Sequence, residues 1–271
     1  MISRSLWPSL DILDRQLTDT AAIGILTDAD GTLSEIQDHP GLARVSKGMA
    51  GALSRLNKVY PLVAVVSGRR ACDVQRLVGV KELLYLGNHG LEWRQGETDL
   101  SRATDKEALP MTRLLDELGD GLPDAPGLYL EDKSAVIAIH YRQCPDSEAV
   151  ATARELARRL ASKYDLVVQD GRCIIEIRPL QADKGRAVAA LVKEYKLKQV
   201  IYLGDDATDV DAFKALKDFG RDNVAIAIIG DESSEELKLH ADYRVDSIDE
   251  VARFFNWLVD RAESRLTFPH R

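Results

Sequence analysis

Short apolar stretches alternate along the chain with amphipathic ones. Five apolar runs, each ending just before Asp, Ser or Gly, cover residues 23–27, 62–66, 83–86, 200–203 and 224–229. Runs of this length that are apolar throughout indicate strands buried on both faces, as in parallel sheets. Between them, apolar positions at helical spacing predict helices over residues 45–56 and 187–195, and a capping box at residues 247–250 predicts a final helix. This alternation predicts an α/β fold with a doubly wound, Rossmann-like parallel sheet as its core.

The middle of the chain has a different pattern. Residues 94–124 are charged and interrupted by Gly and Pro, and paired strands are predicted over residues 128–130 and 135–142. An amphipathic helix is predicted over residues 146–164, and a hairpin joins residues 166–169 to 173–177 around Asp170-Gly171. The sequence therefore predicts an inserted α+β domain at residues 94–179, within a core formed by residues 1–93 and 180–271.

Charge and cysteine content narrow the classes of function. The formal net charge is −8, which argues against nucleic acid or an anionic membrane as a partner, because both attract basic surfaces. The three cysteines are widely spaced and form no CxxC pair, so neither a disulfide framework nor a zinc site is expected. The first 17 residues carry charges and lack the apolar segment of a signal peptide. We expect a cytoplasmic protein.

Two carboxylates follow the first predicted strand. Asp28 and Asp30 stand in Asp28-Ala29-Asp30-Gly31-Thr32-Leu33, at the strand's carboxyl end, where open α/β sheets bind their ligands. Such a pair can bind a cation and act on a substrate. An EF-hand calcium loop would need Gly at its sixth position, where Leu33 stands. A plain turn is the other alternative.

A second acidic cluster follows the fourth apolar run. Asp205, Asp206 and Asp209 lie within five positions, and their charges would repel one another without a cation. Mg²⁺ prefers a few carboxylates together with water and phosphate oxygens. An acidic helix N-terminus, favoured by the helix dipole, explains one or two of these residues. It does not explain why an acidic cluster recurs at the ends of two strands.

Two further positions favour an anionic ligand. Lys184 stands near a predicted helix start, where the dipole disfavours a cation unless an anion is close. Ser67 ends the second strand before Gly68-Arg69, and its hydroxyl and the neighbouring amides can hold phosphate oxygens. A solvated lysine and an ordinary Ser-Gly turn are the alternatives.

Taken in order, these motifs resemble the signature of the haloacid dehalogenase superfamily. More closely, the chain resembles trehalose-6-phosphate phosphatases over about residues 23–216. The stretches that carry this resemblance are Leu33-Ser34-Glu35-Ile36, Val66-Ser67-Gly68-Arg69, Gly87-Asn88-His89-Gly90-Leu91-Glu92, Glu131-Asp132-Lys133-Ser134, His140-Tyr141-Arg142, Glu176-Ile177-Arg178-Pro179 and residues 204–209. Ala29 and Asn88 depart from the usual residues, which are a large one such as Tyr and a Ser. The short N-terminus suggests a stand-alone phosphatase, and the inserted domain would be the family's cap domain.

The resemblance implies a mechanism. Asp28 would attack phosphorus and form an aspartyl-phosphate, while Asp30 would protonate the leaving oxygen and then activate water. The implied Mg²⁺ would lie between Asp28, Asp205 and the main-chain carbonyl of Asp30. Asp209 and Asp206 would orient Lys184 or metal-bound water, and we count both among the metal candidates. Thr32, Ser67, Gly68, Arg69 and Lys184 would bind the phosphate.

The inserted domain is the expected source of specificity. Lys133, and His140 with Arg142, lie at alternate positions on predicted strands, so side chains two apart share a face. The resemblance adds Glu131 beside Lys133 as a sugar contact, and His89 follows a core strand and could approach the sugar. An exposed polar sheet face, and an ordinary loop histidine, are the alternatives.

Several functions stay open at the level of sequence. The substrate is expected to be trehalose 6-phosphate, with sucrose phosphate or a glycosyl phosphoglycerate as alternatives, and a phosphosugar mutase would use similar chemistry. A catalytically silent sugar-phosphate sensor belongs to a different class, but a sensor has no need of both Asp28 and Asp30. We expect a monomer whose partner is a small sugar phosphate.

Overall fold

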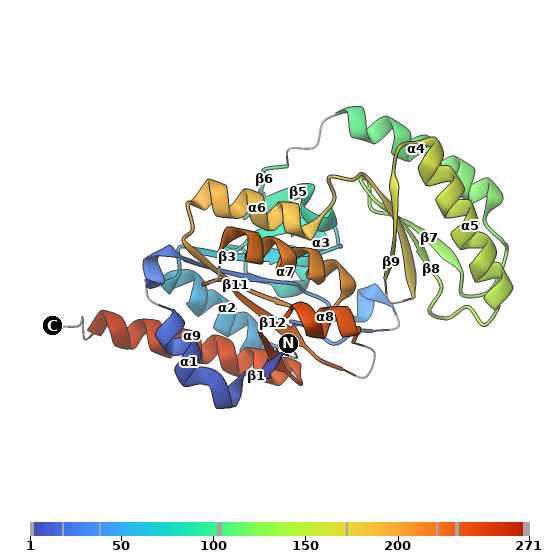
Figure 1. The fold of residues 1–271 in the computed structure, drawn as a ribbon. Coiled ribbons are helices and arrows are strands. Elements are labelled where there is room, and N and C mark those ends of the chain that lie inside the picture. Colours follow the sequence, from blue (N-terminus) through green and yellow to red (C-terminus); the bar gives the residue numbers. More distant parts are fainter. Residues whose placement is uncertain are drawn as a thin grey trace. The chain divides into compact units, whose positions relative to one another are not determined.

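The computed structural model describes residues 3–17, 19–37, 39–101, 105–171, 173–220, 222–230 and 233–267. Its contacts divide the chain into two compact units (Figure 1). The core unit comprises Met1–Leu100 and Asp183–Arg271, and the inserted unit comprises Ser101–Ala182. The core therefore extends a few residues beyond the predicted boundary at 93, because residues 92–99 add two strands to the core sheet.

The described residues of the core form a nine-stranded sheet in the order β1-β13-β12-β11-β2-β3-β4-β5-β6. Its strands are β1 (Arg4–Ser5), β2 (Ile23–Thr27), β3 (Leu62–Val66), β4 (Leu84–Gly87), β5 (Glu92–Gln95), β6 (Thr98–Asp99), β11 (Gln199–Gly204), β12 (Val224–Ile228) and β13 (Tyr243–Val245). The pairs from β1 to β4 are parallel, whereas β5 and β6 are antiparallel additions at one edge. The predicted parallel core is confirmed, and the short strands β1, β5, β6 and β13 were not predicted.

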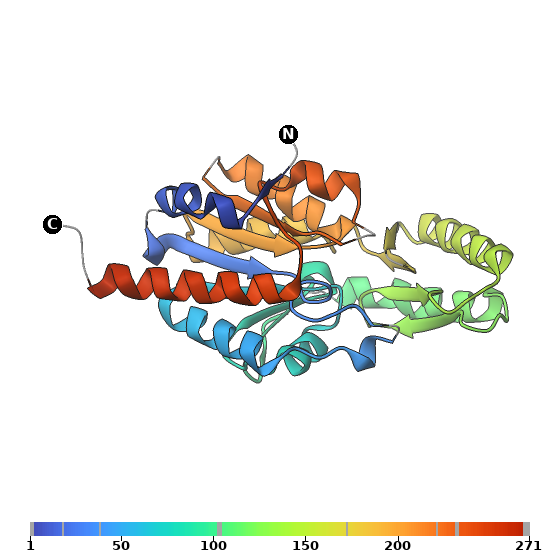
Figure 2. The ribbon, with the colours of Figure 1, turned by 90° about the horizontal axis from the view of Figure 1, so that it is seen from below.

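Helices cover both faces of this sheet (Figures 1 and 2). They are α1 (Leu10–Gln16), α2 (Lys47–Val59), α3 (Ala71–Val78), α6 (Lys184–Tyr195), α7 (Ala207–Phe219), α8 (Glu235–His240) and α9 (Ile248–Thr267). Successive strand residues point to opposite faces. Ile25 therefore packs into a cluster that includes α2 and α9, while its neighbour Leu26 packs into another that includes α6 and α7. This two-sided burial explains why the central strands are apolar throughout.

The described residues of the inserted unit form a four-stranded antiparallel sheet with two helices. Its elements are α4 (Asp105–Gly121), β7 (Tyr129–Asp132), β8 (Ile137–His140), α5 (Ser147–Lys163), β9 (Val167–Gly171) and β10 (Ile174–Arg178), and the strand order is β7-β8-β10-β9. The predicted β-β-α-β-β run is present, but α4 was not predicted. Leu114 and Leu118, both buried at helical spacing, pack with Ile139 and Ile175 against the sheet. This packing outweighs the Gly and Pro in that stretch.

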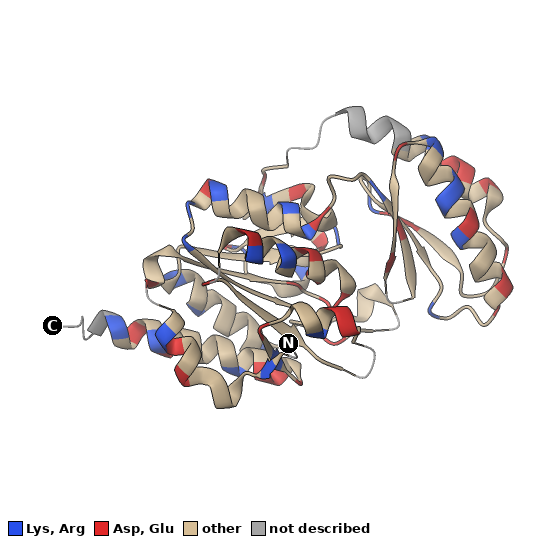
Figure 3. Cartoon of the chain, viewed as in Figure 1, with Lys and Arg blue, Asp and Glu red and all other residues tan. Residues whose placement is uncertain are grey.

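Charged residues of both signs are mixed along the helices (Figure 3). On α5, Lys163 pairs with Glu117 of α4, and on α7, Lys214 pairs with Glu236 of α8. Within the described residues, no helix is both long enough and apolar enough to cross a membrane.

Candidate functional site

The carboxyl ends of β2 and β11 bring two acidic residues together. The strands are neighbours, with Thr27 opposite Leu203, and the Asp28 amide donates to the Leu203 carbonyl over 2.8 Å. Asp28 and Asp205 therefore follow adjacent strand ends, and only 5% and 3% of their surfaces are exposed. Two buried carboxylates so close need positive charge nearby.

The turn after β2 packs closely around Asp205. Gly31 has φ +81°, and a Cβ at this position would lie 2.0 Å from Asp205 Oδ2. The Thr32 hydroxyl is 3.4 Å from Asp205 Oδ1, a long hydrogen bond. Glycine therefore serves twice here, because it accepts the left-handed backbone and leaves room for a carboxylate.

Lys184 supplies the positive charge. It is the first residue of α6, which Asp183 caps by accepting the Arg186 amide, and it is 3% exposed. Its Nζ lies 2.7 Å from Asp28 Oδ1 and 2.7 Å from Asp209 Oδ1. Burial lowers the pKa of Lys184, but Asp209 and Asp28 raise it by more, so the ammonium stays charged.

Burial also dominates the chemistry of Asp28. It raises the pKa of this carboxyl from 3.8 to about 7; Asp209 adds to the rise and Lys184 opposes it. Further positive charge beside this carboxyl would favour its ionised form, which is the form that can act as a nucleophile. Perturbed pKa values of this kind cluster at functional sites.

Asp209 holds the acidic cluster in place. Its Oδ1 accepts from Lys184 and from the Tyr202 hydroxyl, each over 2.7 Å, and its Oδ2 accepts the amides of Asp205 and Asp206 over 3.0 Å. Asp206, by contrast, is the N-cap of α7, and its carboxylate accepts the Ala207 amide over 2.6 Å. A helix-capping role thus accounts for Asp206, the alternative that the sequence left open.

Three carboxylates have the spacing of a metal site. Oxygen atoms of Asp28, Asp205 and Asp209 all lie within 4.8 Å of one another. When all three carboxylates are ionised, their charge exceeds that of the Lys184 ammonium by two, which suits a divalent cation, and an all-oxygen donor set suits Mg²⁺. The residues therefore fit the predicted ion. The carboxylates of Asp30 and Asp206 lie outside this group.

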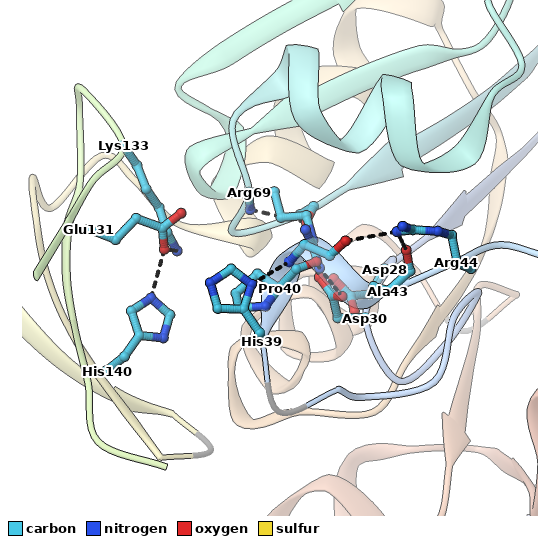
Figure 4. Close-up of polar contacts among 12 residues, drawn as sticks. Asp28, Asp30, His39, Pro40, Ala43, Arg44, Arg69, Glu131, Lys133 and His140 are labelled. Carbon is cyan, nitrogen blue, oxygen red and sulfur yellow. Dashed lines mark hydrogen bonds and ion pairs between the residues drawn. The ribbon is translucent and has the colours of Figure 1, made fainter. Parts of the chain in front are cut away.

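The predicted acid/base residue and a predicted phosphate ligand meet in one ion pair. Arg69 donates from Nε to Asp30 Oδ2 and from Nη2 to Asp30 Oδ1, each over 2.7 Å, and its Nη2 also reaches the Pro40 carbonyl at 3.0 Å (Figure 4). A bidentate guanidinium fixes the plane of a carboxylate. The sequence did not predict this pairing, which orients Asp30.

A strained turn braces the Ser67 loop. Asn88 and His89 are both buried and both left-handed, with φ values of 48° and 55°. The His89 amide donates to the Ser67 carbonyl over 2.9 Å, and the Asn88 amide donates to the Arg69 carbonyl over 2.7 Å. Left-handed conformations of non-glycine residues cost energy and cluster at functional sites. His89 thus supports Ser67 through its backbone, and its contact with a sugar stays a prediction.

In the inserted unit, polar residues gather on one sheet. Glu131 Oε2 lies 2.7 Å from His140 Nε2, a pair visible in Figure 4, and 4.0 Å from Lys133 Nζ. Lys133, 7% exposed, donates to Glu176 Oε1 over 2.7 Å. Glu131 and Glu176 both stand opposite Ala138, whose small side chain separates them. We call Glu131, Lys133, His140 and Glu176 the polar cluster.

One expectation about this unit needs correction. Arg142 does not share a strand with His140, because β8 ends at His140 and Arg142 lies in the turn that follows. The alternation argument therefore does not apply to Arg142. Glu176 was not predicted as a site residue, although it is a charged position within the apolar run of β10. Its pairing with Lys133 shows why a buried acid is tolerated there.

Comparisons with known proteins agree with this geometry. The family model described as trehalose-phosphatase matches residues 26–249. A trehalose-phosphate phosphatase of Mycobacterium avium (strain 104) is 35% identical over 252 residues, which are 88% of this chain and 62% of that protein. The chain thus spans less than two thirds of the length of this relative.

Two more comparisons extend the likeness. A probable trehalose-phosphate phosphatase E of Arabidopsis thaliana is 31% identical over 259 residues, covering 90% of this chain and 72% of that protein. The C-terminal domain of a Candida albicans trehalose-6-phosphate phosphatase shares the fold, with a TM-score of 0.79 at 22% identity over 95% of this chain and 98% of that one. From these matches, the chain belongs to the trehalose-phosphatase family.

Proposed function

We propose that this protein is a Mg²⁺-dependent phosphatase that hydrolyses trehalose 6-phosphate to trehalose and phosphate. The observation that carries the proposal is the buried Asp28, joined to Lys184 and grouped with Asp205 and Asp209 at one sheet edge. Family membership supports phosphate-ester chemistry at this site. The substrate rests on what the relatives are named for.

The reaction has two steps on Asp28. A carboxylate oxygen of Asp28 forms a bond to phosphorus while the bond from phosphorus to the sugar oxygen breaks, and Asp30 gives its proton to that oxygen. Asp30 then takes a proton from water, which attacks phosphorus and releases Asp28. The pair with Arg69 holds the ionised Asp30 carboxylate in a fixed plane, and this is the form that takes the proton from water in the second step.

The remaining residues would balance the negative charges of the phosphate and of Asp28. Lys184, Thr32 and Ser67, with the Gly68 amide, would hold the phosphate oxygens. Mg²⁺, held by Asp28, Asp205 and the main-chain carbonyl of Asp30, would supply the charge that lets an anionic nucleophile approach an anionic phosphate. Asp209 would act through Lys184, which it contacts over 2.7 Å.

The polar cluster of the inserted unit would read the sugar. Its members can donate to and accept from hydroxyl groups, and Lys133 and Glu176 already form a buried ion pair in the folded unit. We place the reaction in the cytoplasm, a proposal that the three free cysteines support.

A panel of phosphate esters tests the proposal. Phosphate release would be measured from trehalose 6-phosphate, sucrose 6-phosphate, a glucosyl phosphoglycerate, glucose 6-phosphate and an aryl phosphate, each with Mg²⁺ and with chelator. We expect the highest kcat/KM for trehalose 6-phosphate, and Asp28→Asn should retain less than about a hundredth of the activity.

Other outcomes would point elsewhere. Preference for sucrose phosphate or the phosphoglycerate would replace the substrate and keep the chemistry. Transfer of phosphate to a second sugar hydroxyl would indicate a mutase. Binding of sugar phosphates without any release of phosphate would indicate a sensor and would refute the proposal.

A further inference from the structure

Tyr202 lies in the middle of the central strand β11 and contacts Asp209, one of the three clustered carboxylates, through its hydroxyl. Its side chain is completely buried, and its hydroxyl donates to Asp209 Oδ1 over 2.7 Å. The same Oδ1 atom accepts from Lys184, whose Nζ also contacts Asp28. A continuous chain of hydrogen bonds therefore runs from the phenol through Asp209 and Lys184 to the nucleophile.

The position of this tyrosine is held from two sides. Phe213 of α7 packs edge-on against its ring, with centroids 5.9 Å apart and planes at 84°. The neighbouring strand positions are Leu26 of β2 and Ala225 of β12. Burial, followed by the charge of Asp209, raises the pKa of Tyr202 well above its ordinary value, so the phenol keeps its proton and acts as a donor.

Asp209 depends on this donor for its own placement. A Cβ at Gly204 would lie 2.3 Å from Asp209 Cγ, so the carboxylate is pressed against the end of β11. Two backbone amides hold Oδ2, whereas the side chains of Tyr202 and Lys184 hold Oδ1. Without the phenol, Lys184 would be the main side-chain donor to Asp209 Oδ1.

We propose that Tyr202 is a positioning residue that acts through Asp209 to hold Lys184 against Asp28. The proposal deepens the proposed function and rests on it for its catalytic meaning. When the phenol donates to Oδ1, it takes part of the negative charge that would otherwise attract Lys184. The ammonium is then shared equally between the two carboxylates, at 2.7 Å from each. Loss of the phenol moves Lys184 toward Asp209 and away from Asp28.

A pair of matched variants tests this role. Tyr202→Phe removes the hydroxyl and keeps the ring, and Tyr85→Phe does the same to a tyrosine that is equally buried in β4, where its hydroxyl donates to the Val80 carbonyl. Both variants lose one buried hydrogen bond, and Tyr202→Phe is expected to lose somewhat more stability because its bond ends on a carboxylate.

Only Tyr202→Phe should affect turnover. We expect its kcat on trehalose 6-phosphate to fall by about tenfold or more, since misplacement of a catalytic group is costly. Its KM should change by less than about threefold, and Tyr85→Phe should stay within about twofold of the unmodified protein in both constants. Equal kcat values for the two variants would overturn the proposal. If Tyr202→Phe does not fold, Phe213→Leu, which loosens the ring and keeps the hydroxyl, should lower kcat in the same way.

A double-mutant cycle measures the coupling without turnover. Unfolding equilibrium constants would be compared in chelator for Tyr202→Phe, Lys184→Met and the double variant, and for Tyr85→Phe with Lys184→Met. Because Tyr202 and Lys184 share one acceptor atom, their effects should deviate from additivity by at least about threefold, and those of Tyr85 and Lys184 should be additive. Additivity in both cycles would refute the inference. Absence of any turnover by the unmodified protein would refute the proposed function and leave this cycle to decide the role of Tyr202.

Discussion

The buried charge of Asp28 makes a prediction about stability that needs no substrate. In the folded core the pKa of Asp28 is raised from 3.8 to about 7, chiefly by burial. In the unfolded chain it returns to its ordinary value of about 3.9. Between these two values the unfolded chain has lost its proton while the folded protein still holds it. The raised pKa of Asp28 therefore has no effect on stability below about pH 4. It lowers the free energy of unfolding progressively as the pH rises toward 7.

The magnitude follows from the difference between the two pKa values. A pKa difference of that size lowers the free energy of unfolding by about 4 kcal/mol. The full loss is reached above pH 7, and part of it is already present at pH 6. Asp28→Asn carries no titrating group at this position. In chelator, its free energy of unfolding should therefore rise relative to that of the unmodified protein by up to about 4 kcal/mol between about pH 4 and pH 8.

Tryptophan fluorescence in urea gives a suitable assay. Trp7, Trp93 and Trp257 are the three tryptophans, and all lie in the core unit, so the signal reports the unit that contains Asp28. Asp218→Asn, at an exposed position of α7, is the control. The gap between its free energy of unfolding and that of the unmodified protein should not change with pH. Added Mg²⁺ should narrow the gap by stabilising the unmodified protein. A gap that is the same at about pH 5 and pH 8 would refute the reasoning.

Three further outcomes are expected. Glu131→Ala or Lys133→Ala should lower kcat/KM for trehalose 6-phosphate by about tenfold to a hundredfold and leave an aryl phosphate nearly unchanged; an equal fall on both would contradict a role in reading the sugar. Calcium should inhibit in phosphate-release assays, because its looser geometry lets it bind both oxygens of the nucleophile, and activation equal to that by Mg²⁺ would contradict this. Gly31→Ala, whose Cβ would lie 2.0 Å from Asp205, should weaken Mg²⁺ binding in calorimetry by at least about tenfold. The control Gly79→Ala, at φ +75° with open space around it, should cost only about 1 kcal/mol of stability. Equal Mg²⁺ affinities for the two variants would disprove the steric argument.

The core fold could be predicted from local pattern. Strands buried on both faces must be apolar throughout, and residues 23–27, 62–66 and 224–228 show this directly. The stretches at residues 92–99 and 105–121 were not predicted, because they lack such a clear local pattern. Short edge strands have little pattern of their own, and α4 is stabilised by packing against the inserted sheet despite its Gly and Pro.

The sequence by itself also determined the chemical types at the core site. Acidic residues directly after strands must lie at the carboxyl edge of a parallel sheet, so sequence alone places Asp28 and Asp205 at the same edge. Which strands are neighbours was decided only by the tertiary structure, which places β11 beside β2. The pairing of Arg69 with Asp30, and of Tyr202 with Asp209, likewise depends on residues brought together from different elements or across a turn. Local pattern carries the period of each element, whereas strand order, register and side-chain direction come from packing of the whole chain, so contacts of this kind have no local signature.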